Sequence, residues 1–228
     1  MSLKNNFGFS IAELLQRGDK FIFCFDRDKA EFEGYGYGDD IRSTIISSIA
    51  ALKALPTDIY YEGEQKMCTN NKNEIREDLE HDINDLANRS RLALGAKSVE
   101  YSLFRFGTLA ELSDNDMVSK ASHVVQVAQK RMDKLAKRMV NDELLNAITT
   151  GGNKLDDAID KQAEAQSIRK EKVVERHNMA NDLYKNMSEL CEAGKRIWKG
   201  KNEAYYTDYV IYGSSKPMAD QAEEDNEE

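Results

Sequence analysis

The chain of 228 residues is long enough for one large domain or two small ones. Apolar residues make up 40% of it and charged residues 32%, a ratio that excludes a thick globular core and favours long helices with one buried stripe. The formal charge is −9, but six acidic residues after position 218 supply −6 of it, so the body carries only −3. We therefore expect no nucleic-acid partner.

The sequence shows no sign of secretion or membrane insertion. Its three cysteines, Cys24, Cys68 and Cys191, are odd in number and far apart, which argues against a disulfide framework or a zinc site. The chain does not start with a basic segment followed by an apolar one, and no stretch reaches the roughly 18 apolar residues of a membrane span. We expect a cytoplasmic protein without an integral membrane segment.

The first 38 residues have a mixed pattern. Residues 10–17 predict a short amphipathic helix. Residues 20–32 contain a dense run of phenylalanines with the length and composition of a strand, although Phe21, Phe25 and Phe32 also suit one face of a helix. We favour the helix and leave the strand open. A turn follows at three closely spaced glycines, Gly34, Gly36 and Gly38.

Two helices with clear ends come next. Asp39 can cap a helix whose isoleucine stripe runs to Leu55, where Pro56 forces a stop. A much longer helix is predicted over residues 57–94, and Gly95 closes it in the position where helices often end with glycine. At 1.5 Å per residue this helix is about 55 Å long.

The second half contains two further helices. An aromatic connector, residues 98–112, leads to a capping box at Ser113, after which apolar residues repeat at helical spacing to Met139. A short helical turn then breaks at 149–152, where two threonines precede two glycines. A second capping box opens the longest helix, about 154–199, which has a nearly heptad seam and spans about 69 Å.

Each of the two long helices has a polar middle, at residues 69–74 and 161–172. The interpretation that we favour is two solvated stretches beyond the compact core, because runs of charge are usually exposed. In the alternative, the two stretches face each other and set the register of the helices at a cost in stability.

Together these elements predict an all-α fold, an elongated antiparallel helical bundle dominated by the two very long helices at 57–94 and 154–199. We expect a single domain over residues 1–217, within which 1–38 form an N-terminal segment of uncertain structure. Residues 218–228 have no apolar face to bury and predict a disordered acidic tail.

Two motifs suggest phosphate chemistry but lack its framework. Asp26 and Asp28 follow the apolar run as an Asp-x-Asp pair, as in haloacid-dehalogenase-type phosphotransferases, but the rest of the chain offers no parallel sheet to carry them. The glycines at 34–38 match neither phosphate-binding pattern, and acidic Asp39 and Asp40 follow them. A solvated helix face and a turn are the better interpretations.

One group of side chains has metal-ligand character. His81 lies one helical turn from Glu77, Asp78 and Asp85, so a modest metal-binding cluster is conceivable, although a surface histidine in ordinary ion pairs is the commoner case. The paired Glu-x-x-His motifs of a di-iron bundle are absent. No histidine has a local partner that would activate a serine or cysteine nucleophile.

Two more clusters have a structural and a functional interpretation. The basic residues near the end of the helix at 113–139 could bind an anionic surface, but cations are also favoured there by the helix dipole. The aromatic ending at 205–212 could line a ligand pocket with Trp198, but we expect it to pack back onto the bundle. The basic residues are Lys130, Arg131, Lys134, Lys137 and Arg138.

Several segments resemble a bacterial family of uncharacterised long-helix bundle proteins that has no assigned activity. The resemblance covers most of the chain and rests on helix ends and packing positions, with no catalytic residue among them. It implies the helical fold and leaves the function open. The matching segments are 54–58, Leu94-Gly95 with Ser98 and Tyr101, 112–116, 190–195 and 208–212.

No motif demands a particular chemistry, so we predict no catalytic residue, no cofactor and no enzyme. Long helices leave extended faces for partners, and we therefore expect a non-enzymatic bundle that acts through protein–protein contacts or self-assembly, as a homo-oligomer. One alternative is a bundle that binds a metal or a small ligand at the His81 cluster. Another is a membrane-active, rod-shaped protein that releases the apolar segments 21–25 and 41–55.

Overall fold

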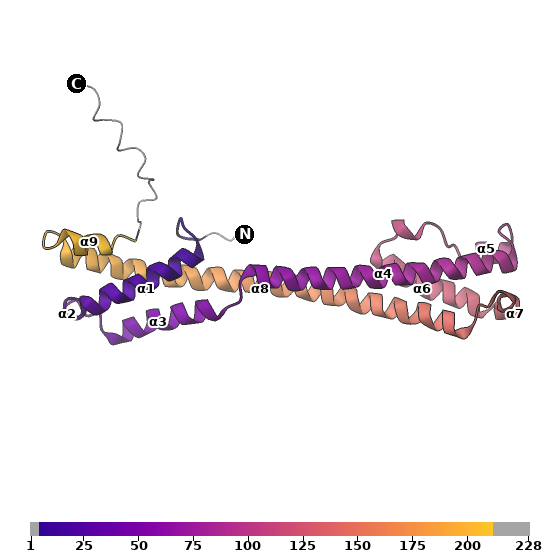
Figure 1. Ribbon diagram of the computed structural model, residues 1–228, viewed down its shortest axis with the longest axis horizontal. Helices are drawn as coiled ribbons and strands as arrows, with labels where there is room; N and C mark the ends of the chain where they lie inside the picture. The colour runs from indigo at the N-terminus through magenta and orange to yellow at the C-terminus, as the bar shows by residue number, and fades with distance from the viewer. Residues whose placement is uncertain (1–4, 212–228) are drawn as a thin grey trace, which may run out of the picture. The chain divides into compact units, whose positions relative to one another are not determined.

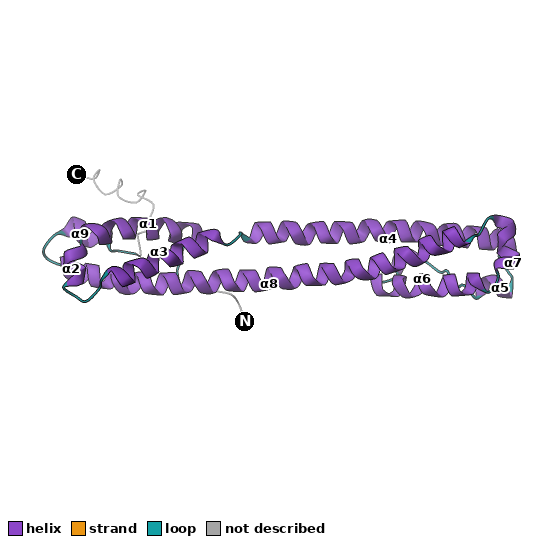
Figure 2. Ribbon diagram, turned by 90° about the horizontal axis from the view of Figure 1, so that it is seen from below, coloured by secondary structure: helices purple, strands orange, loops and turns teal. Residues whose placement is uncertain are grey.

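The computed structural model describes residues 5–211, and all regular structure in this range is helical (Figures 1 and 2). This confirms the all-α prediction, whereas the predicted acidic tail, 218–228, lies outside the described residues. None of the described helices is long and apolar enough to cross a membrane. The helices are α1 (Ile11–Arg27), α2 (Lys29–Glu33), α3 (Asp39–Ala54), α4 (Asp58–Leu94), α5 (Val99–Ser102), α6 (Asp114–Gln129), α7 (Met132–Leu135), α8 (Asp142–Trp198) and α9 (Glu203–Asp208), with single 3₁₀ turns η1 (Leu109–Glu111) and η2 (Ala136–Arg138).

The chain divides into two compact units. Within the described residues, unit 1 is formed by 5–56 together with 173–211, and unit 2 by 57–172. Each unit has a hydrophobic core of its own. In unit 1, α1 and α3 pack with the carboxyl-terminal part of α8. In unit 2, α4 and α6 pack with the amino-terminal part of α8.

The open question about residues 20–32 is settled in favour of helix, because α1 and α2 cover almost the whole segment. Phe21, Phe25 and Phe32 are buried, whereas Phe23 is 71% exposed. A strand would place Phe21, Phe23 and Phe25 on one face, but the helical repeat turns Phe23 away from the other two. The Ser10 hydroxyl caps the start of α1 by accepting from the backbone N–H of Glu13, at 3.1 Å.

The predicted break at 149–152 is wrong, because α8 passes through it and begins twelve residues before the predicted start at 154. Both glycines allow a neighbouring helix to come close. A Cβ atom at Gly151 would lie 3.1 Å from Leu79 of α4, and one at Gly152 would lie 3.1 Å from Ala121 of α6. These glycines therefore serve helix packing, and the residue that caps α8 is Asn141, whose side chain accepts from the Leu144 N–H at 3.0 Å.

The helix predicted from Ser113 to Met139 is shorter than expected. Its capping box is confirmed, since the Ser113 hydroxyl accepts from the Asp116 N–H at 3.2 Å. However, α6 ends at Gln129, and the chain turns into α7 and η2. Met139, which the pattern places in the core, is instead 72% exposed and has a positive φ of 58°.

The polar middles of the two long helices contact each other inside unit 2. Arg169 of α8 donates two hydrogen bonds to the Asp58 carboxylate of α4, at 2.8 and 2.9 Å. Further along, the Gln162 amide donates to the Thr69 hydroxyl at 2.9 Å. The Gln162–Thr69 pair joins the two predicted polar stretches, as the alternative requires. Asp58 lies outside them, and residues 70, 71, 73 and 74 are exposed, as the favoured interpretation requires. Each interpretation is therefore confirmed in part.

One packing prediction concerns Gly194 of α8, where a Cβ atom would overlap the ring of Tyr209. Gly194→Ala removes a helix-weakening glycine, yet we expect it to lower the free energy of unfolding by about 1–3 kcal/mol because the ring must move. Urea unfolding measures this loss. In a Tyr209→Ala background the same change should cost nothing; an equal cost in both backgrounds would contradict the overlap.

Candidate functional site

The most unusual polar group of unit 1 is Asp28, which lies between α1 and α2 and is only 1% exposed. Arg27 donates to both of its oxygens, through Nε at 2.8 Å and Nη2 at 2.7 Å. Trp198 Nε1 donates at 2.9 Å and the Tyr209 hydroxyl at 2.7 Å. A charge so far from water needs partners of this kind, and they come from both ends of unit 1 in the sequence.

Opposing effects set the protonation of this cluster. Burial raises the pKa of Asp28, but hydrogen bonds from Arg27, Tyr209 and Trp198 outweigh burial and hold the pKa below its ordinary value. Burial, and then the neighbouring Asp28, raise the pKa of the Tyr209 phenol well above its ordinary value. At neutral pH the carboxylate is ionised and the phenol is protonated, which suits a fixed bond and not a proton transfer.

The same cluster holds the chain's aromatic ending in place. The Arg27 guanidinium lies 3.6 Å from the centre of the Tyr205 ring and donates to Asp208 at 2.8 Å. Tyr205 in turn meets Trp198 edge to face, with ring centres 4.8 Å apart. The prediction that this segment packs back is thus confirmed for the described residues, while Tyr212 lies outside them.

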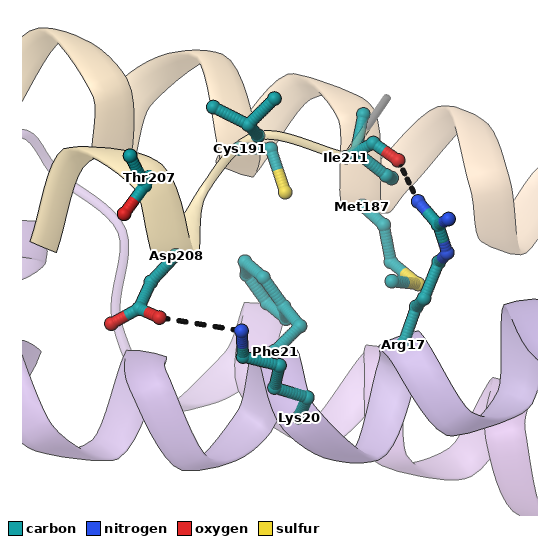
Figure 3. A pocket seen from close by; sticks show the side chains of 9 residues that line it. Arg17, Lys20, Phe21, Met187, Cys191, Thr207, Asp208 and Ile211 are labelled. Carbon is teal, nitrogen blue, oxygen red and sulfur yellow. Dashed lines mark hydrogen bonds and ion pairs between the residues drawn. The ribbon is translucent and has the colours of Figure 1, made fainter. Parts of the chain in front are cut away.

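Next to this cluster is a pocket of about 260 Å³, lined by α1, α8 and the segment around α9 (Figure 3). Its apolar lining is formed by Phe21, Met187, Cys191, Val210 and Ile211. Its two cations are engaged: Lys20 pairs with Asp208 at 3.3 Å across the pocket, and Arg17 donates to the carbonyl oxygen of Ile211 (Figure 3).

The pocket offers little reactivity. Burial raises the pKa of the Cys191 thiol to about 12, so at neutral pH this group is protonated and a poor nucleophile. Burial likewise raises the pKa of Cys24. Among residues 5–211, no three His, Cys, Asp or Glu side chains come together as a metal ion would require. The pocket has room for a small molecule, but none of the side chains that line it is an activated nucleophile or a metal ligand.

The structure separates the two aspartates of the Asp-x-Asp pair. Asp28 is buried in the cluster, whereas Asp26 lies on the surface and accepts from Arg42 of α3 at 2.7 Å. The apolar segments 21–25 and 41–55, which the membrane-active alternative would release, contribute Phe21, Phe25 and four further residues to the core of unit 1. These four are Cys24, Ile45, Ile49 and Leu52.

The four candidate metal ligands all lie on α4 but do not converge. Glu77, Asp78 and His81 are exposed, and Asp85 is engaged by Arg89 at 2.8 Å. The basic cluster is also divided, since α6 ends before Lys130. Within that cluster, Lys134 pairs with Glu100 at 2.7 Å and Arg131 donates to a backbone carbonyl, so the five cations do not form one helix face.

Sequence reasoning missed a groove in unit 2. It is lined by Asp78 and Asp82 of α4 and by Glu143, Ala147 and Lys154 of α8. The signal that points to it is the glycine pair at 151–152, because adjacent glycines inside a helix mark a close approach to two neighbours. Because the pair is interpreted as a helix break, the sequence does not predict that residues 142–154 of α8 run alongside α4.

Comparison with known proteins adds no further assignment. No family model matches the chain, and neither a curated protein nor a solved structure matches it. The geometry of the described residues is therefore the basis for the proposals that follow.

The Asp28 cluster generates a prediction about stability and pH. Asp28→Asn should cost about 1–3 kcal/mol of unfolding free energy at pH 7, because the buried donors lose a charged acceptor. Since folding lowers the pKa of Asp28, its contribution is complete above the unfolded value, near 4, and is lost as the pH falls through the folded value.

The gap in stability between wild type and Asp28→Asn should accordingly shrink as the pH is lowered below about 4. Chemical denaturation at a series of pH values measures the gap. Asp26→Asn is the matched control, and at this exposed position we expect a change of less than about 1 kcal/mol. A gap that stays constant down to pH 3 would contradict the assignment.

Proposed function

We propose that one face of α4 is a contact surface, because unit 2 leaves the apolar side chains on this face uncovered. Ile59 is 79% exposed and Met67 is 67% exposed. Gly63 lies between them, and a Cβ atom there would have nothing within 4 Å. A spacing of four residues places all three on one side of the helix.

The opposite side of α4 is already occupied. Asp58 and Thr69 hydrogen-bond to α8, and both views show α4 and α8 side by side along this stretch (Figures 1 and 2). A glycine in an exposed helix interior costs about 1 kcal/mol relative to alanine. No contact in the described part of the chain accounts for Gly63, but a helix that packs against this face would.

On this proposal the protein is non-enzymatic and acts by self-association through the face formed by Ile59, Gly63 and Met67. The same face on a second copy makes a self-complementary contact, in which the two glycines let the helix backbones approach closely. The α4–α8 pairs of two copies would then form a four-helix arrangement with apolar residues between them. Single exposed apolar residues are common, so the supporting observation is their combination with an otherwise unexplained glycine.

This proposal is compatible with the cytoplasmic location that the sequence suggests. It is also compatible with the resemblance to bacterial long-helix proteins. It does not use the pocket of unit 1, where the nearby cations are engaged and the thiol is protonated. It also leaves the apolar segments of unit 1 in their core, as opposed to the membrane-active alternative.

The Gly63→Ala substitution distinguishes self-association through this face from a purely monomeric protein. In a monomer this change should stabilise α4 by about 0.5–1 kcal/mol, since the site is open and alanine is the better helix former. If a second copy packs there, the added methyl groups should weaken self-association at least about tenfold, equivalent to about 1.4 kcal/mol. Sedimentation velocity from about 1 to 100 μM measures self-association, and urea unfolding at the lowest concentration measures the stability of the monomer.

Met67→Glu should also abolish association, because it puts a charge into the contact. Leu92→Glu is the matched control, since Leu92 lies on the same helix with a similar exposed fraction, 63%. Wild-type protein that stays monomeric to about 100 μM would overturn the proposal. Equal effects of the two substitutions would exclude this face as the contact.

A further inference from the structure

A second surface of unit 2 has the form of a docking groove. Two open cavities of about 400 and 360 Å³ lie between α4 and α8 and share two lining residues, Glu143 and Ala147. Together they follow α4 over residues 75–89 and α8 over 143–154, continuing onto residues 139 and 141 just before α8. At 1.5 Å per residue, the groove is roughly 20 Å long, which matches about four turns of an α-helix.

The floor of the groove is apolar. Ile75 and Leu79 line it from α4, and Ala147 and Gly151 line it from α8. The absence of a side chain at Gly151 brings α8 close to Leu79, while Gly152 makes the corresponding contact with Ala121 of α6. Since no residue of α6 lines either cavity, α6 leaves this side of the α4–α8 pair uncovered.

The rim of the groove is predominantly acidic. Asp78, Asp82 and Glu143 have no ion-pair partner in the described part of the chain, and Lys154 is the one cation on this rim that is not paired there. The other cation, Arg89, is engaged by Asp85 and by the carbonyl oxygen of Met139 at 3.1 Å. Burial raises the pKa of Asp82; nearby His81 opposes this rise, while Asp78 and Asp85 add to it. A cation placed beside these carboxylates would relieve their mutual repulsion.

We propose that this groove binds an amphipathic basic helix of a partner protein. Its apolar face would lie on Ile75, Leu79 and Ala147, and its lysine or arginine side chains would reach Asp78, Asp82 and Glu143. Helix-in-groove recognition uses this combination of an apolar floor, a length of several turns and charges at the rim. The groove is separate from Ile59, Gly63 and Met67, so this proposal and self-association stand or fall independently.

The probe is a fluorescent model peptide of about 14 residues, the length that fits the groove, with leucines on one helix face and lysines on the other. Its counterpart has glutamates in place of the lysines. Fluorescence anisotropy with the full chain should show binding of the lysine peptide and at least about tenfold weaker binding of the glutamate peptide. Equal binding of both peptides would overturn the proposed charge recognition.

Ala147→Arg tests the location, because Ala147 is exposed and lines both cavities. We expect at least a tenfold loss of affinity for the lysine peptide, whereas Ala163→Arg, the same change at an exposed position of α8 outside the groove, should leave the affinity within about twofold. Circular dichroism checks that both variants are folded. If both substitutions weaken binding equally, the peptide binds by net charge alone and the proposal fails.

Neutralising the rim with Asp78→Asn, Asp82→Asn and Glu143→Gln should weaken binding as well, with the apolar floor unchanged. An unchanged affinity would contradict the assigned role of these carboxylates. Sedimentation of Ala147→Arg identifies a different occupant: if this variant loses self-association while the lysine peptide does not bind wild type, a second copy of the chain fills the groove and the proposal is overturned.

Discussion

A helix as long as α8 depends on finding a partner along its length, because helical stability in water comes mainly from packing an apolar face. From 142 to 158, α8 has the core of unit 2, and from 180 to 197 it has the core of unit 1. Between them, residues 161–172 contain few apolar side chains, and Gln162 and Arg169 hydrogen-bond to α4 in this stretch. The Arg169–Asp58 and Gln162–Thr69 pairs therefore carry a stretch that hydrophobic packing does not.

The polar contact between α4 and α8 determines which surfaces of unit 2 stay exposed. A polar seam between α4 and α8 fixes their register by hydrogen-bond geometry, which an apolar seam does less strictly. Ile59 and Met67 of α4 are exposed in this stretch, and they form the proposed self-association face. Further along, where α6 covers one side of the pair, the other side remains an acidic groove. Both proposed contacts thus arise from the same two helices.

Much of the fold follows from the sequence because helix ends and apolar stripes are local features. Pro56, Gly95 and the Ser113 cap mark the positions where helices end or begin. The errors occur where distant residues decide. Gly151 and Gly152 have the composition of a break, and only Leu79 and Ala121, more than 30 positions away along the chain, reveal their role in packing. Likewise, the partners of Asp28 lie about 170 to 181 positions away in the case of Trp198 and Tyr209, so its burial has no local signal.

Hydrogen exchange of the backbone amides in α4 at 58–72 and α8 at 159–172 tests most directly whether polar pairs hold these two helices together. We expect slow exchange in both stretches, and Arg169→Ala should make both exchange faster together while the amides around Ile83 and Leu86 stay protected. Exchange in the wild type as fast as in an unfolded peptide, or a substitution that affects α8 alone, would contradict the claim that polar pairs hold these two helices together.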